Sequence, residues 1–317
     1  MGKRIASLLL LIAMLAIGAV SVVVAQETDD PVKIQIYTQF YQNRENNKTV
    51  AYKAARDYLA RYAAKDKDQY VDFLQKWTAA YERDERKRVL RGLINEKNFT
   101  EAYSTGARIL ADEPDYLRAQ IDLGYAGYIA LSSNNTTYTT DALGYARKAI
   151  AAIDAGKVPN EWEPFKGKDD TLAYLNFAVG FMVLKTAPEQ AIDSLIKAAS
   201  FESEIKKNPR TFYALAAAYE SGPYKTQSAT YQSMYGGKDE TPASKAALEK
   251  INVLIDRMID AYARAIALAT DPAMEQSKTT WMTSLSNYYK FRHNGADAGL
   301  TEYIASALSR PLPPKPQ

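Results

Sequence analysis

The residue types that most often carry out catalysis are rare in this sequence of 317 residues. His293 is the only histidine, and it stands near the end of an expected helix, where the helix dipole alone favours a cation. The sequence contains no cysteine, no glycine-rich phosphate loop, no His-Glu-x-x-His and no Gly-x-Ser-x-Gly. We therefore expect a protein that is not an enzyme and that needs no metal or other cofactor.

Two pairs of close carboxylates are the remaining candidates for hydrolysis or calcium binding. Asp169 and Asp170 precede a helical run, where Asp170 fits a helix cap. Glu161 and Glu163 flank Trp162 in a Pro-bounded linker. Because both positions have these structural explanations, we assign neither pair to a site.

A tyrosine-rich stretch at 221–242, SGPYKTQSATYQSMYGGKDETP, interrupts the helical pattern. Tyr224, Tyr231 and Tyr235 lie in it among serine, glutamine and glycine, the composition of a recognition loop. Long loops are uncommon unless they are functional or disordered. The stretch is thus predicted to be an insertion loop that either binds a ligand or is a flexible connection.

The elements that must position these residues are helices. Apolar residues recur at steps of three and four, alanine is abundant, and no segment alternates as a strand does. Asp30-Pro31, Asn208-Pro209 and Thr241-Pro242 each place a capping side chain before a proline that fits the first turn. The sequence therefore predicts an all-α fold.

One stretch of the chain has the pattern of a helical hairpin. In NEKNFTEAYSTGARILADEPD, small residues at Ala102 and Gly106 are followed by Ile109 and Pro114, and the next helix supplies Leu123-Gly124. This pattern resembles the tetratricopeptide repeat, in which small residues let two helix backbones approach closely. The resemblance is strongest between about residues 83 and 131.

Fainter copies of the second helix of this hairpin occur before and after it. Their first alanines are separated by 51, 40, 49 and 70 residues, whereas the family period is 34, so long helices or insertions must absorb the difference. We expect a right-handed superhelical solenoid of antiparallel helix pairs over residues 26–310. The copies are Ala51-Ala55-Tyr58, Ala102-Gly106-Ile109, Ala142-Ala146-Ala149, Ala191-Leu195-Ala198 and Ala261-Ala265-Leu268.

The resemblance also implies a concave face that binds extended peptides. In the family, the first helix of each pair lines this face, and a pair of cations there can hold a peptide carboxylate. The neighbouring ERDERKR is also compatible with an ordinary solvated face. Transferred by spacing, the partner-binding residues are Lys87, Arg91, Asn95, Arg118, Tyr125 and Tyr128.

The two ends of the chain differ from the helical part. Residues 1–25 carry Lys3 and Arg4 before a long apolar run that ends at Val23-Val24-Ala25, the pattern of an export signal that is either cleaved or kept as an N-terminal membrane anchor. The expected location is the bacterial periplasm, the cell envelope or the medium. Residues 311–317 form a proline-rich tail that we expect to be extended, disordered and unpacked.

The charge balance argues against one class of partner. Without Lys3 and Arg4 the chain has 38 basic and 37 acidic residues, which argues against nucleic-acid binding. The sequence thus favours a scaffold that binds a protein or peptide partner. The alternative is a protein that binds a glycan or small ligand beneath the tyrosine-rich insertion, and the membrane is a partner only through an uncleaved anchor.

Overall fold

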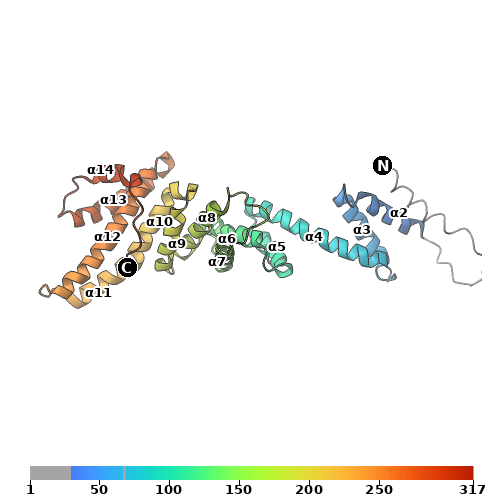
Figure 1. Ribbon diagram of the computed structural model, residues 1–317, viewed down its shortest axis with the longest axis horizontal. Coiled ribbons are helices and arrows are strands. Elements are labelled where there is room, and N and C mark those ends of the chain that lie inside the picture. The colour runs from blue at the N-terminus through green and yellow to red at the C-terminus, as the bar shows by residue number, and fades with distance from the viewer. Residues whose placement is uncertain (1–29, 67–68, 317) are drawn as a thin grey trace, which may run out of the picture. The chain divides into compact units, whose positions relative to one another are not determined.

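The computed structural model describes residues 30–66 and 69–316, in which all regular elements are helical (Figure 1). The predicted all-α class is therefore confirmed. The proposed export signal lies outside the described residues. Among the helices of the described ranges, none is both long and apolar enough to cross a membrane.

Helices begin at the predicted combinations of a capping side chain and a proline. Asp30 accepts a hydrogen bond from the Val32 amide at 2.9 Å. Thr241 and Ser244 cap each other's amides at 3.1 and 2.9 Å. Asn208 likewise caps the helix that follows it. These bonds satisfy amide donors that have no partner inside the first helical turn.

The chain divides into two compact units rather than the single array expected for residues 26–310. The first unit ends at Glu82 and contains α2 (Pro31–Asn43), α3 (Lys48–Tyr62) and the start of α4 (Gln69–Asn95). Phe40, Tyr58 and Leu74, one from each helix, are at most 1% exposed and form its centre.

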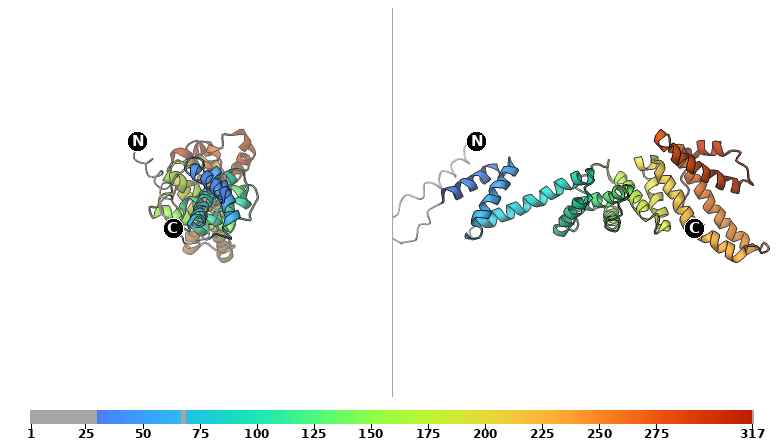
Figure 2. Two further views of the ribbon diagram at one scale, coloured as in Figure 1. Left: turned by 90° about the vertical axis from the view of Figure 1, so that its right-hand side faces the viewer. Right: turned by 180° about the vertical axis from the view of Figure 1, so that it is seen from behind.

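The second unit begins at Arg83 and contains the rest of α4 and all later elements. Within it α6 lies beside α7, α8 beside α9, and α10 beside α12 (Figures 1 and 2). Its helices are α5 (Phe99–Asp112), α6 (Leu117–Ser132), α7 (Thr139–Asp154), α8 (Lys168–Val183), α9 (Pro188–Ser200), η1 (Glu204–Lys207), α10 (Pro209–Tyr219), η2 (Glu220–Tyr224), α11 (Lys225–Tyr235), α12 (Pro242–Leu268), η3 (Pro272–Met274), α13 (Glu275–Arg292), α14 (Leu300–Ala305) and η4 (Ala307–Ser309).

Small residues bring α6 and α7 together, as the sequence predicts. A Cβ atom on Gly124 would lie 2.7 Å from the Cα of Ala146, and one on Gly127 would overlap the Cβ of Ala142. Both alanines are fully buried. The missing glycine side chains therefore permit this close approach of the two helices.

The insertion at 221–242 is mostly helical, which corrects the predicted loop. A π-helical turn, η2, bends at Gly222, and α11 continues from it beside α12. Polar residues fit α11 because Thr226 and Thr230 donate their hydroxyl protons to carbonyls one turn earlier. Only residues 236–241 lie between helices.

The proline-rich tail is also different from the expectation. Residues 311–316 form no helix, but they lie against the second unit, and Leu312 packs on its main core. Every residue here is a proline or directly precedes one, and both conditions favour extended backbone. The tail is therefore extended, as predicted, but it is packed on the second unit rather than unpacked.

Candidate binding site

The predicted basic stripe on α4 is neutralised by carboxylates of the same unit. Lys87 Nζ lies 2.6 Å from Glu113 Oε1 and 4.4 Å from the centre of the Tyr116 ring. Arg91 Nη2 lies 2.7 Å from Glu161 Oε1. These cations are near the loops around residues 113 and 161, but their charges already have partners.

Arg118 is not an exposed cation, which corrects its predicted role. It is 4% exposed and donates Nε to Asp122 Oδ2 at 2.8 Å, while Nη1 donates to the main-chain oxygen of Glu161 at 3.2 Å. A buried charge without a partner would be costly, and the carboxylate one helical turn later supplies that partner. The spacing of four residues between Arg118 and Asp122 was the visible signal for this pair.

Of the other residues expected on the concave face, Asn95 is exposed to solvent, whereas Tyr125 and Tyr128 pack against neighbouring rings. Asn95 is exposed at the end of α4. Tyr125 makes an edge contact with Phe165 at 5.6 Å, and burial raises the pKa of its phenol. Tyr128 makes an edge contact with Phe177 at 5.0 Å. Both tyrosines thus fill space between helices.

The insertion tyrosines pack on neighbouring rings. Tyr224 meets Tyr288 edge-on at 5.8 Å, and Tyr288 donates its hydroxyl to Glu220 at 2.7 Å. Tyr231 and Tyr235 contact each other at 5.5 Å between ring centres. The Tyr224 contact joins η2 to α13, whereas the contact between Tyr231 and Tyr235 lies within α11.

The candidates for catalysis are not gathered into one site. His293 is exposed at the end of α13 and stacks on Tyr289 at 4.0 Å. Glu161 pairs with Arg91, as described above. Asp170 is not the helix cap we expected: it lies inside the first turn of α8 and accepts the Lys166 amide at 2.9 Å.

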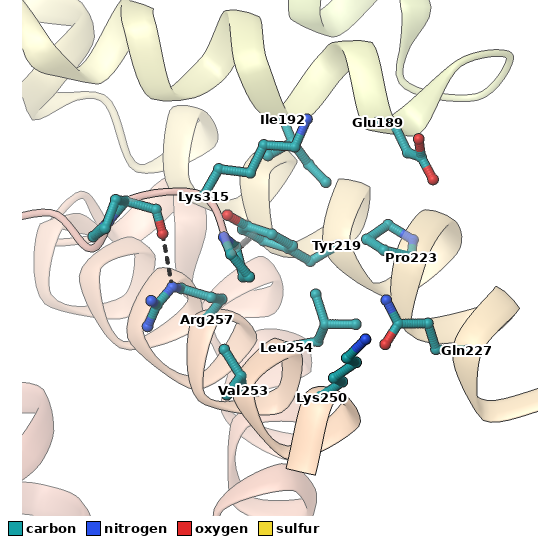
Figure 3. A pocket seen from close by; sticks show the side chains of 12 residues that line it. Glu189, Ile192, Tyr219, Pro223, Gln227, Lys250, Val253, Leu254, Arg257 and Lys315 are labelled. Carbon is teal, nitrogen blue, oxygen red and sulfur yellow. Dashed lines mark hydrogen bonds between the residues drawn. The ribbon is translucent and has the colours of Figure 1, made fainter. Parts of the chain in front are cut away.

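A cavity of about 580 Å³ lies where the tail meets α9, α10, η2, α11 and α12 (Figure 3). We call it the tail cavity. It lies entirely within the second unit, and the insertion contributes Pro223 and Gln227 to it rather than tyrosines. Its lining residues are Glu189, Ile192, Tyr219, Pro223, Gln227, Lys250, Val253, Leu254, Arg257, Pro314, Lys315 and Pro316.

Two helices give the tail cavity walls of opposite charge. Glu189 lines it from α9, and Asp193 follows one turn later on the same helix. Lys250 and Arg257 line it from α12, seven residues apart and therefore on one face. Figure 3 shows the α9 side chains above the cavity and the α12 side chains below it. An occupant thus meets the Glu189 carboxylate on one side and the cations of Lys250 and Arg257 on the other.

The tail makes polar contacts with both walls. Lys315 Nζ lies 2.8 and 2.9 Å from the two carboxylate oxygens of Asp193. On the opposite side, Arg257 Nε donates to the main-chain oxygen of Pro314 at 2.9 Å (Figure 3). The tail is held by one charged side chain and by its backbone.

Farther along α12, a buried arginine holds the start of the tail. Arg264 is 5% exposed, and its Nε donates to Asp260 at 2.6 Å. Its Nη2 donates to the main-chain oxygens of Arg310 and Pro311 at 2.9 and 2.8 Å. This arrangement repeats that of Arg118, which also pairs with an aspartate four residues away and bonds to the backbone of a Pro-bounded segment.

Tyr219 places a polar atom without a partner at the tail cavity. The residue is 2% exposed, and its hydroxyl makes no hydrogen bond to any described residue. Burial raises the pKa of this phenol to about 12. An unbonded buried hydroxyl is uncommon because losing water without a replacement bond costs free energy. Its oxygen is covered in this structure, so a ligand can supply an acceptor only by moving the surrounding groups aside.

Sequence reasoning identified the tail but missed the cavity against which it lies. Lys315 and Asp193 are 122 residues apart, and no local pattern connects them. Comparisons with models of protein families, with curated proteins and with solved structures find no match to this chain. The site is therefore interpreted from its own geometry.

Proposed function

We propose that this protein is a non-enzymatic interaction scaffold that holds an extended segment of a partner protein in the tail cavity. One observation carries the proposal: arginines of the second unit donate to main-chain oxygens of extended, proline-bounded segments of the same chain. Arg118 bonds to Glu161 in this way, Arg264 to Arg310 and Pro311, and Arg257 to Pro314. Main-chain recognition suits a surface that binds extended peptides.

The proposal includes the architecture that the resemblance implies, a right-handed solenoid of tetratricopeptide type. Neighbouring helix pairs such as α6–α7 and α8–α9 support it, as do the close contacts at Gly124 and Gly127. Such arrays expose long surfaces on which an extended segment can lie.

The proposed location is the periplasm or the cell envelope, or outside the cell. The basic start and the apolar run within residues 1–25 support export, and the run is long enough to serve as an anchor if it is not cleaved. Labelling the mature N-terminus of the exported protein will decide between cleavage after Ala25 and retention of the segment.

Selection from a random peptide library tests the proposed function. We expect the full chain to retain peptides that bind the Arg257→Ala variant at least tenfold more weakly, since a hydrogen bond from a charged donor is worth about 1.5–3 kcal/mol. Arg108→Ala is the matched control because Arg108 is an exposed arginine on α5 of the same unit. If no peptide is retained, or if both variants bind the retained peptides equally, the scaffold proposal is wrong.

A second candidate is a protein that binds a glycan or another small ligand in the same cavity. The volume of the tail cavity, about 580 Å³, is within the usual range of small-molecule sites, roughly 300–1,000 Å³. Gln227 and the Tyr219 hydroxyl would supply the polar contacts. Calorimetric titration with cell-wall oligosaccharides would favour this candidate if binding is lost in Gln227→Ala and if the peptide library yields nothing.

A further inference from the structure

The tail forms one wall of the cavity, and the way in which it is held there indicates which kind of segment could take its place. Three features of the bound tail are recognised: extended backbone imposed by prolines, a main-chain oxygen at Pro314, and the cation of Lys315. We propose that the tail cavity binds a proline-rich, lysine-bearing segment of a partner protein, and that the tail is its internal competitor. This inference rests on the proposed function and names its ligand class.

The carboxylates of α9 favour a cation at the place that Lys315 takes. Asp193 bonds to Lys315 through both carboxylate oxygens, at 2.8 and 2.9 Å. Glu189, one turn earlier on α9, lines the cavity and has no ion pair with any residue in the described ranges. A segment that carries a second cation would meet this carboxylate as well. An acidic side chain in either place would be repelled, and the cations of Lys250 and Arg257 line only the opposite side of the cavity.

The tail leaves part of the site unused. The Tyr219 hydroxyl has no partner among the described residues, and Gln227 and Lys250 lie on the far side of the cavity from the tail contacts (Figure 3). A longer segment could supply acceptors to these groups. The tail therefore makes only some of the bonds that the cavity offers, which allows a partner segment to replace it.

Attachment to the same chain gives the tail an advantage over a free peptide. Its effective concentration at the cavity is on the order of millimolar. The apparent affinity of a partner equals its intrinsic affinity multiplied by the fraction of molecules whose tail is displaced. Weakening the tail should therefore strengthen binding from solution, a result that a purely structural tail would not produce.

The test uses a fluorescent peptide with the sequence RPLPPKPQ and the full chain, read by fluorescence anisotropy. In Lys315→Glu the tail is repelled by Asp193, so we expect the peptide to bind up to about fivefold more tightly than to the unchanged protein. Lys148→Glu, the same charge change at an exposed position of α7, should leave binding unchanged.

A charge reversal identifies the contact. In a Lys315→Ala background, where the tail no longer uses Asp193, Asp193→Lys should weaken binding of RPLPPKPQ at least threefold, and the peptide RPLPPEPQ should bind this double variant more tightly than it binds Lys315→Ala alone. Circular dichroism will show that each variant has kept its helices. Recovery of binding by the reversed peptide cannot be produced by misfolding.

Two results would overturn the inference without touching the proposed function. One is that library peptides bind through Arg257 but contain neither proline nor lysine, and that Lys315→Glu does not alter their affinity. The other is that the unchanged protein self-associates with rising concentration and that Lys315→Glu abolishes this, which would assign the cavity to the tail of a second copy. If no peptide binds at all, the proposed function fails first.

Discussion

Replacing Tyr219 by phenylalanine should stabilise the second unit, although the substitution removes a polar group from the interior. The hydroxyl is buried and makes no hydrogen bond within the described residues, so folding takes it from water without a replacement. Such a group costs about 1–3 kcal/mol. Phenylalanine keeps the ring and removes the cost. We expect a gain of about 1–2 kcal/mol, with an increase in Tm of roughly 2–4 °C for each kcal/mol in a unit of this size.

Tyr103→Phe is the matched control, because the same atom is removed from a bonded position. Tyr103 is also buried, and its hydroxyl donates to the main-chain oxygen of Leu123 at 2.8 Å. Losing this bond should destabilise the protein by about 1 kcal/mol. The two Tyr→Phe substitutions are therefore predicted to change the free energy of unfolding in opposite directions, as measured by scanning calorimetry.

The difference in the free energy of unfolding between Tyr219→Phe and the unchanged protein should also increase at alkaline pH. The folded pKa of Tyr219 is raised to about 12 from an ordinary value of 10.0. In the unfolded chain this phenol ionises above about pH 10, so its contribution to stability is complete below that pH and declines as the pH rises toward 12. The phenylalanine variant lacks this decline, and contributions of the other tyrosines cancel in the comparison. A variant that is less stable than the unchanged protein, at neutral pH and in alkali, would refute the claim that the hydroxyl is unbonded.

Four further substitutions test the helix packing, a buried ion pair and a helix cap, each by chemical denaturation. Gly127→Ala should cost about 1–3 kcal/mol because its new methyl overlaps Ala142, whereas Gly144→Ala, which meets open space, should gain about 0.5–1 kcal/mol; equal effects would contradict the helix contact. Arg118→Ala should cost about 3–5 kcal/mol by leaving Asp122 buried without its partner, and a loss below 1 kcal/mol would show that water reaches this pair. Thr241→Ala should cost about 0.5–2 kcal/mol by removing the cap of α12, and no change would mean that Ser244 suffices.

The sequence predicted those features that depend on neighbours along the chain. The spacing of Ala142, Ala146 and Ala149 identified a buried helix face, and all three are fully buried. Capping residues before proline identified helix starts at Asp30 and Thr241. Such signals are local because a helix is built from contacts three and four residues apart.

Features that depend on tertiary contacts were predicted less well. Arg118 has the same spacing from its neighbours whether its face is buried or exposed, and only the packing of the linker near Glu161 decides between the two. The polar composition of 225–235 suggested a loop, but packing against α12 makes it a helix. The tail was recognised as extended because proline acts locally, while its contact with Asp193 depends on a residue 122 positions away.

Arg257 and Arg264 donate hydrogen bonds to main-chain oxygens, which every amino acid possesses. Arg264 and Arg257 bond to the backbone at Arg310, Pro311 and Pro314, so most side chains of that strip can be exchanged without losing these bonds. The sequence of this segment can therefore change in evolution while its backbone keeps the same position beside α12. Homologues of this protein would then differ in the residues at 310–314 while keeping a basic residue at the positions of Arg257 and Arg264.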